Sequence, residues 1–174
     1  MNIKEKLNRP IVLVGMMGAG KSYLGHALAD ALSLALVDSD AEIEKQEARS
    51  ISDIFAKDGE PAFRAIERDV ITSLLQRPPQ VIATGGGAVV TPETLTAMEQ
   101  QGLMIWLNPS LQTIWGRIAH ETHRPLLACD NPQDVLQDLM DKRRDLYGRA
   151  HIHIDDSADS VDHILEKIAE HLNR

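Results

Sequence analysis

Apolar and polar positions alternate along the chain in a way that predicts strands and helices in turn. Short apolar runs typical of buried strands lie at 11–14, 34–37, 81–83, 103–107 and 151–154. Helical spacing follows between them, and it is clearest in the last stretch, where the inward positions are Val161, Ile164, Leu165, Ile168 and Leu172. Strands separated by helices predict a five-stranded parallel sheet covered on both faces, which is a three-layer α/β/α fold. In such sheets, ligands bind beyond the carboxyl ends of the strands.

Local signals predict where several helices begin and where the simple alternation is interrupted. A capping side chain stands directly before a proline at 91–92, 108–109 and 131–132, which predicts helix starts at these three places. Residues 40–76 carry a helical pattern without a strand, long enough for two or three short helices. Residues 119–131 form a polar connection without periodicity. We expect the first insert to cap a substrate and the second to be a mobile lid.

The string GMMGAGKS, residues 15–22, follows the first strand and fits the P-loop pattern G-x-x-x-x-G-K-[S/T]. Its glycines let backbone N–H groups curl around a phosphate, and the helix predicted from Tyr23 to about Leu32 directs its positive end at the same anion. Lys21 supplies a charge for the outer phosphates, and the Ser22 hydroxyl is a suitable ligand for Mg²⁺. The string predicts binding of a nucleoside triphosphate.

Two aspartates, Asp38 and Asp40, stand at the end of the second strand, beside the P-loop in this architecture. Asp38 is suited to hold Mg²⁺ through a water molecule. Asp40 is suited to accept a hydrogen bond and then the proton of a substrate hydroxyl. The alternative is that Asp40 only caps the helix beginning at Ala41.

Arg64 and Glu67 occur in the string DGEPAFRAIERD, where Pro61 suits the first turn of a helix. The spacing of three residues allows an ion pair that would orient the guanidinium. That arginine would be suited to grip a carboxylate with two parallel hydrogen bonds, whereas a surface salt bridge of small value is the alternative.

Three glycines, Gly85, Gly86 and Gly87, follow the third strand, where many P-loop proteins carry an acidic residue that helps to hold Mg²⁺. Glycine permits close approach of the backbone to a ligand. A tight turn into the next helix is the alternative, but such a turn seldom needs three glycines.

Composition and charge narrow the class of protein. The 174 residues, 43% of them hydrophobic, suit one domain. The net charge of −8 argues against nucleic acid as a partner but not against an anionic ligand held by a few arginines. The single cysteine, Cys129, excludes an internal disulfide. We expect a cytoplasmic protein, because the N-terminus lacks the apolar core of a signal peptide and no run is long enough to cross a membrane.

Six motifs occur in a fixed order over essentially the whole chain. They are GMMGAGKS, the D-S-D after the second strand, G-E-x-x-F-R-x-x-E, the three glycines, RPLL and R-x-x-x-Y. Together they resemble the shikimate kinase family. The resemblance implies transfer of the ATP γ-phosphoryl group to the 3-hydroxyl of shikimate, in the biosynthesis of aromatic amino acids.

The resemblance also implies roles for individual residues. Asp40 would orient the acceptor hydroxyls and serve as base, and Arg64 and Arg143 would clamp the shikimate carboxylate. Gly85–Gly87 would lie against the ring. Arg124, in the lid, would neutralise charge in the transition state. Nucleotide contacts would come from Gly15, Met16, Met17, Gly18, Ala19, Gly20, Lys21, Ser22, Tyr23, Arg117 and Arg124, and Mg²⁺ ligation from Ser22 and, through water, Asp38.

Parts of the chain depart from the family pattern or leave alternatives. The stretch DDSADS, at 155–160, lacks the proline that family members commonly place against the adenine. Arg144 adjoins Arg143, and the latter is preferred because it stands four residues before Tyr147. Without the resemblance, Arg117 and Arg124 would be interpreted as solvated surface residues. We expect a monomer.

Other P-loop proteins fit less well. No Asn-Lys-x-Asp guanine motif is present and no predicted strand ends in Asp-x-x-Gly, as a GTPase would require. A nucleoside monophosphate kinase would carry more arginines around the acceptor. A kinase of another small polyol acid such as gluconate, and a catalytically silent ATP-binding module, are the remaining alternatives.

Overall fold

The computed structural model describes residues 3–121, 128–155 and 160–174. Its five strands form one sheet, and helices connect them. The strands are β1 (Ile11–Val14), β2 (Leu36–Asp38), β3 (Val81–Ala83), β4 (Leu103–Asn108) and β5 (Ile152–Asp155). The helices are α1 (Ile3–Lys6), α2 (Lys21–Leu32), α3 (Ser39–Glu47), α4 (Ile51–Asp58), α5 (Glu60–Leu75), α6 (Pro92–Gln101), α7 (Leu111–Ile118), α8 (Pro132–Tyr147) and α9 (Val161–Leu172), with a 3₁₀ turn, η1, at Ala88–Val90.

The five strands form a parallel sheet in the order β2-β3-β1-β4-β5. All four residues of the central strand β1 are buried, because helices cover both faces of the sheet. The predicted α/β/α fold with five parallel strands is confirmed. The order reverses beside β1, which is where an open sheet of this kind offers a crevice for ligands.

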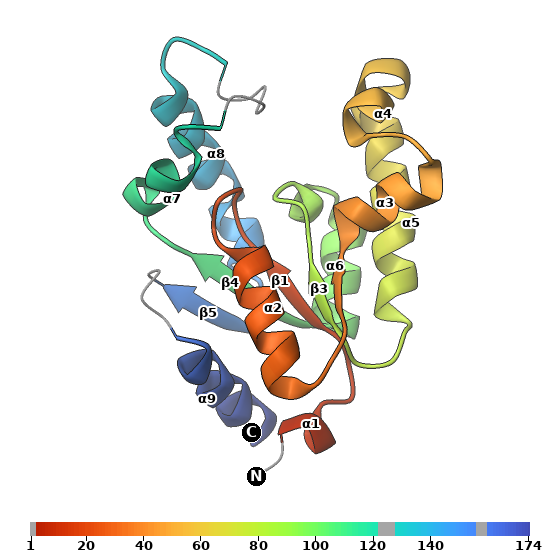
Figure 1. Ribbon diagram of the computed structural model, residues 1–174, viewed down its shortest axis with the longest axis vertical. Helices are drawn as coiled ribbons and strands as arrows, with labels where there is room; N and C mark the ends of the chain where they lie inside the picture. Colours follow the sequence, from red (N-terminus) through yellow and green to blue (C-terminus); the bar gives the residue numbers. More distant parts are fainter. Residues whose placement is uncertain (1–2, 122–127, 156–159) are drawn as a thin grey trace.

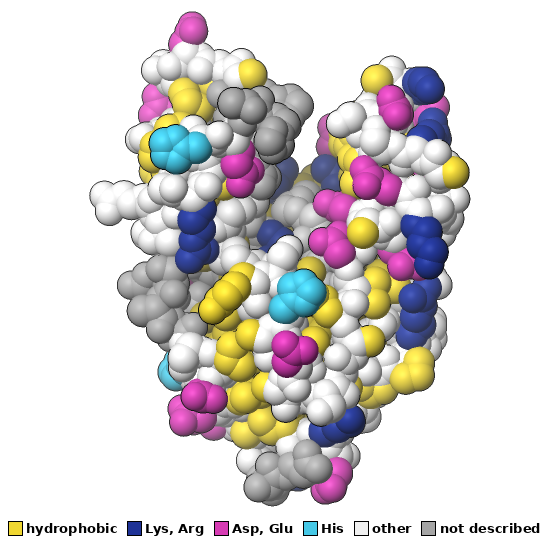
Figure 2. Space-filling view, viewed as in Figure 1, with side chains coloured by type: hydrophobic (Ala, Val, Ile, Leu, Met, Phe, Trp, Pro, Cys, Tyr) yellow, Lys and Arg dark blue, Asp and Glu magenta, His cyan; other side chains and the backbone are white. Residues whose placement is uncertain are grey.

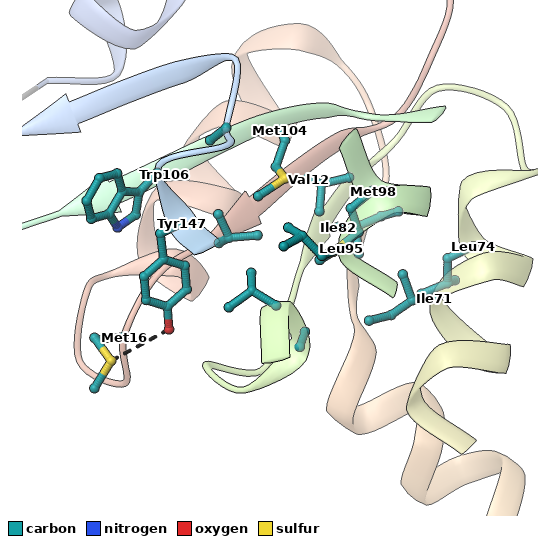
Figure 3. Close-up of a cluster of buried hydrophobic side chains, with 14 of the residues drawn as sticks. Val12, Met16, Ile71, Leu74, Ile82, Leu95, Met98, Met104, Trp106 and Tyr147 are labelled. Atoms are coloured by element: carbon teal, nitrogen blue, oxygen red, sulfur yellow. Dashed lines mark hydrogen bonds between the residues drawn. The ribbon is translucent and has the colours of Figure 1, made fainter. Parts of the chain in front are cut away.

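Two hydrophobic cores lie against the two faces of the sheet. One gathers Ile11 and Leu13 of β1 with side chains from α2 and α9. The other gathers Val12 and Val14 with Trp106 of β4 and side chains from α3 to α8, including Tyr147 (Figure 3). Successive β1 side chains thus enter opposite cores, as the period of a strand requires.

Figure 1 shows how the layers frame the functional end of the sheet. The α7–α8 pair rises on one side and the α3–α5 group on the other, with the loop that follows β1 between them. The helices of α3–α5 fill the region 40–76, in which the sequence predicts two or three short helices, and the last of them is 16 residues long.

Several predicted boundaries shift. The helix after the P-loop begins at Lys21 rather than Tyr23, and β2 begins at Leu36 rather than at residue 34. The helix start predicted at 108–109 is wrong, because β4 runs on to Asn108 and the Ser110 hydroxyl accepts the Thr113 N–H at the start of α7. The starts at Pro92 and Pro132 are confirmed, although neither Thr91 nor Asn131 uses its side chain as a cap.

Along the described ranges, none of the helices is both long and apolar enough to cross a membrane.

Candidate active site

A cavity of about 610 Å³ opens at the carboxyl ends of the strands. Figure 2 shows this face hollowed between its two upper parts, with basic and acidic side chains inside the hollow. The lining residues are Met17, Gly18, Ala19, Gly20, Lys21, Ser22, Tyr23, Leu24, Asp38, Asp40, Thr84, Gly85, Gly86, Leu107, Pro109, Arg117 and Ile154. The cavity therefore joins the P-loop to the aspartates after β2 and to the glycines after β3.

The P-loop is a tight cradle that its glycines make possible. Gly15 has a φ of +148°, and a Cβ there would lie 2.5 Å from the Leu107 carbonyl oxygen. Gly18 has a φ of +73°, and its Cβ would lie 2.6 Å from the Ile118 side chain. No other residue type fits either position without moving the backbone or its neighbours.

Two cations lie against this cradle. The Lys21 ammonium group donates to the carbonyl oxygens of Gly15 and Met16, at 2.7 and 2.8 Å. The Arg117 guanidinium donates to the Gly18 carbonyl at 2.9 Å. Since α2 begins at Lys21, its positive end adds to the charge that a phosphate would meet here.

Asp38 and Asp40 lie in different environments, and the sequence does not predict which of the two caps the next helix. The Asp38 carboxylate accepts the backbone N–H groups of Asp40 and Ala41, at 2.9 and 3.0 Å, so Asp38 caps α3. The alternative in which Asp40 caps a helix beginning at Ala41 is therefore wrong. Asp40 lies within the first turn and faces the cavity.

Removal from water, followed by the repulsion of Asp38, raises the pKa of Asp40 to about 6. Glu67 acts in the same direction, and Lys21 opposes them. A carboxyl group with this pKa is ionised at neutral pH and holds a proton more readily than an ordinary aspartate, which suits a general base.

The three glycines leave room for the charged groups around them. A Cβ at Gly85 would lie 2.9 Å from a carboxylate oxygen of Asp40, and one at Gly87 would lie 2.5 Å from the Arg64 guanidinium. Any larger residue at 85 or 87 would therefore displace Asp40 or Arg64. The turn-only alternative does not explain this double approach.

Arg64 is held by two carboxylates of its own helix. Its guanidinium donates to Glu67 at 2.8 Å and to Glu60 at 3.3 Å. Only 1% of the Glu67 side chain is exposed, so the pair is not the surface salt bridge offered as the alternative. Burial raises the pKa of Glu67 against the opposing effect of Arg64.

Arg143 and Tyr147, on the last turns of α8, meet at one carbonyl of the glycine turn. Arg143 donates to the Gly86 oxygen at 3.1 Å, and the Tyr147 hydroxyl donates to the same oxygen at 2.5 Å. Arg144 is exposed and pairs with Asp141. The geometry thus brings Arg143, and not Arg144, to the glycine turn.

Comparison with known proteins identifies the family. The family model described as shikimate kinase matches residues 17–173. A shikimate kinase of Paramagnetospirillum magneticum is 46% identical over 159 residues, which are 91% of this chain and 81% of the relative. The chain belongs to the shikimate kinase family.

Further relatives agree with this assignment. A shikimate kinase of Cereibacter sphaeroides is 38% identical over 98% of this chain and 85% of its own length. A solved shikimate kinase from Acinetobacter baumannii, in complex with shikimate, superposes with a TM-score of 0.85 at 36% identity and covers 95% of this chain and 93% of its own. As a shikimate kinase, the protein is an ATP-dependent transferase of aromatic amino-acid biosynthesis.

The structure gathers most of the predicted site residues of this shikimate kinase in one place. Residues 17–23 of the predicted nucleotide site line the cavity together with Asp38, Asp40, Gly85, Gly86 and Arg117. Gly15 and Met16 accept from Lys21 through their carbonyls, and Arg64, Gly87 and Arg143 adjoin the cavity through the contacts described above. Arg124 and the rest of residues 122–127 in the predicted lid lie outside the described residues, as do residues 156–159 of the DDSADS stretch.

Other cavity residues were not predicted from the sequence. Leu107, Pro109 and Ile154 line the cavity at the ends of β4 and β5, and Thr84, which follows β3, lines it as well. Their place at the carboxyl ends of strands was the available signal. In the sequence, Tyr147 fixes the register of Arg143 and is not itself predicted as a site residue, although the spacing of four residues puts both side chains on one helix face.

Proposed function

We propose that this kinase transfers the γ-phosphoryl group of ATP to the 3-hydroxyl of shikimate, with Asp40 as general base. The supporting observation is the convergence of Asp40 and Arg64 on the three glycines, next to the P-loop. One wall of the cavity offers cations for phosphates, and the other offers a base beside groups suited to a carboxylate. The solved shikimate kinase from Acinetobacter baumannii, which is in complex with shikimate, supports the choice of acceptor.

In the proposed step, the 3-hydroxyl oxygen attacks the γ-phosphorus while its proton passes to the Asp40 carboxylate. The bond between the γ-phosphorus and the β–γ bridging oxygen breaks, and ADP leaves. The pKa of about 6 favours this transfer because the carboxylate is ionised at neutral pH and is a stronger base than an ordinary aspartate.

The nucleotide phosphates bind to the P-loop backbone, and Lys21 moves from the Gly15 and Met16 carbonyls to the outer phosphates. Arg117 lies close enough to the P-loop to contact the nucleotide. The remaining nucleotide contacts are those of Ser22 and Tyr23, together with Arg124, which neutralises charge that develops on the transferred group. Residues 119–131 act as the lid that brings Arg124 into place.

Arg64 and Arg143 clamp the shikimate carboxylate. Glu67 orients Arg64, and the Gly86 carbonyl orients Arg143, so both guanidinium groups are positioned before shikimate arrives. Residues 40–76, which form α3 to α5, act as the cap over the acceptor. The single chain supplies all these groups, and we propose that it acts as a monomer in the cytoplasm.

Ser22 and Asp38 fit a Mg²⁺ site. Both line the cavity, and both present oxygen atoms, the ligands that Mg²⁺ prefers. Kinases generally bind this ion through one or two protein oxygens and the nucleotide phosphates, so a larger cluster of acidic groups is not required. When bound, Mg²⁺ would draw negative charge from the phosphates; Ser22 would hold it directly, and Asp38 through a water molecule.

The test is the rate of ADP release by the purified protein with ATP and Mg²⁺, measured with shikimate, with gluconate and without an acceptor. We expect a large increase with shikimate alone. An increase with gluconate alone would identify gluconate, and not shikimate, as the acceptor. No increase with either would favour a silent ATP-binding module. The position of the phosphoryl group on the product is then read by ³¹P–¹H NMR spectroscopy.

A further inference from the structure

The three glycines form a β-turn whose central peptide can adopt two orientations. The Ala88 N–H donates to the Gly85 carbonyl at 3.1 Å, which closes a four-residue turn over 85–88. Gly87 has φ −92° and ψ 0°, the values of the third residue of a type I turn. A type II turn differs by a flip of the peptide between Gly86 and Gly87, and it needs a positive φ at the third position, which glycine permits.

The orientation of this peptide decides what the turn presents to the acceptor site. In a planar trans peptide, the carbonyl of Gly86 and the N–H of Gly87 point in opposite directions. A flip would exchange the two groups. The turn would then present a carbonyl oxygen to shikimate in place of an N–H group. The flip would also change the backbone beside Arg64, whose guanidinium lies 2.5 Å from the position that a Gly87 Cβ would take.

Two side chains hold the peptide in the observed orientation. Arg143 and Tyr147 both donate to the Gly86 oxygen, at 3.1 and 2.5 Å. The Tyr147 hydroxyl also lies 3.6 Å from the Met16 sulfur (Figure 3), but it has one proton to donate and the carbonyl is the stronger acceptor.

Tyr147 itself is rigidly placed. Its side chain is 1% exposed, and its ring stacks on Trp106 with centroids 5.8 Å apart. A buried ring of this kind loses little further freedom when its hydroxyl makes a hydrogen bond. In the proposed function, by contrast, Arg143 also donates hydrogen bonds to the shikimate carboxylate.

We propose that Tyr147 is a positioning residue for the acceptor: its hydroxyl locks the central peptide of the 85–88 turn in the type I orientation. The lock keeps the Gly87 N–H directed away from Tyr147 and leaves space for Arg64. It acts on the acceptor side of the cavity and not on the nucleotide. This inference rests on the proposed function, because it takes the glycine turn to be part of the shikimate site.

The test is Tyr147→Phe, which keeps the ring and removes the hydroxyl. We expect the KM for shikimate to rise about two- to tenfold, the loss of one net hydrogen bond. The KM for ATP should stay unchanged, and kcat should fall by less than the KM rises. The matched control is Thr94→Val, which removes a buried hydroxyl that has no hydrogen-bond partner in the described structure and should leave both KM values unchanged.

An unchanged KM for shikimate in Tyr147→Phe would overturn the proposal, and so would a parallel rise in both KM values with a lower melting temperature. If wild type itself shows no shikimate-dependent ADP release, the proposed function fails instead, and the two failures are therefore distinct.

If the variant does not fold, fluorotyrosine incorporated into the wild-type chain reports on Tyr147, because the only other tyrosine is Tyr23. Shikimate should shift the Tyr147 ¹⁹F signal by changing how Arg143 shares the Gly86 carbonyl. A signal unmoved at saturating shikimate would count against the lock.

Discussion

At the scale of single residues, Asp40 shows how burial changes the acidity of an ordinary side chain. The carboxyl group lies near Asp38 and Glu67, which repel its charge, and near Lys21, which attracts it. The balance raises the pKa of Asp40 to about 6. The environment that would suit Asp40 to the proposed role of general base also disfavours its ionised form in the folded chain.

Asp40→Asn should therefore separate activity from stability. The amide cannot take the proton, and we expect kcat to fall about 100- to 10,000-fold, with ATP affinity nearly unchanged. In the wild type, kcat/KM should fall as the pH drops below about 6, where the base becomes protonated. Initial rates and ATP titrations measure both effects, and turnover comparable to wild type would remove Asp40 as the base.

The free energy of unfolding should increase in Asp40→Asn, whereas its activity should decrease. Because the pKa of Asp40 is raised from 3.8 to about 6, the folded chain binds more protons than the unfolded chain between these values. Wild-type stability therefore falls as the pH rises through that window. Asp40→Asn should be more stable at pH 7, by about 1 kcal/mol. The difference should vanish below about pH 4, and urea unfolding at several pH values tests this.

Gly87 offers a second single-residue prediction. Its φ of −92° is open to alanine, so Gly87→Ala should fold, but the new Cβ would lie 2.5 Å from the Arg64 guanidinium. Since Arg64 is the part that must yield, we expect the KM for shikimate to rise about tenfold or more. The KM for ATP should be unaffected.

Gly116→Ala is the matched control for Gly87→Ala. A Cβ at Gly116 meets nothing within 4 Å, and the residue lies inside α7. Alanine should stabilise the protein there by about 0.5–1 kcal/mol without changing either KM. Wild-type kinetics in Gly87→Ala would show that Arg64 does not hold the acceptor.

At the scale of elements, α3 begins at Ser39 because the Asp38 carboxylate satisfies two of its free N–H groups. One side chain thus starts α3 and also lines the cavity. Removing the charge and removing the cap are different changes, and the chain allows them to be separated.

Asp38→Asn keeps a capping oxygen, whereas Asp38→Ala removes it. We expect Asp38→Ala to cost about 1 kcal/mol of stability and Asp38→Asn much less. Both should raise the Mg²⁺ concentration needed for half-maximal rate. Asp38→Asn should also shift the acid limb of the pH profile to lower pH, because a charge that raises the pKa of Asp40 is gone.

Ser160→Ala provides the control, in a helix that contributes no residue to the cavity lining. The Ser160 hydroxyl caps α9 by accepting the His163 N–H, and none of the residues of α9 lines the cavity. It should lose about 1 kcal/mol of stability with no change in Mg²⁺ requirement. An Asp38→Asn enzyme with the wild-type Mg²⁺ requirement would contradict the metal role.

At the scale of the whole molecule, the sequence predicts what depends on local pattern and misses what depends on distant contacts. The buried run at 11–14 identifies the central strand because two-sided burial leaves no polar position. Asp38 and Asp40 both precede a helical pattern, and only the backbone geometry decides which one caps. Arg117 and Tyr147 bond to carbonyls 99 and 61 residues away, and no local spacing shows such partners.

ATP and shikimate should each raise the melting temperature, because each is expected to bind the folded chain and not the unfolded chain. Shikimate at about one hundred times its Kd should add about 2.7 kcal/mol of stability, a rise in Tm of roughly 5–10 °C. Arg64→Lys is the informative variant, since it keeps a cation beside the buried Glu67 but loses the planar fork that grips a carboxylate. It should lose most of the shikimate-dependent rise and keep the ATP-dependent one, measured by differential scanning fluorimetry. Loss of both would mean that Arg64 supports the fold of the whole site, and retention of both would return Arg64 to a structural ion pair.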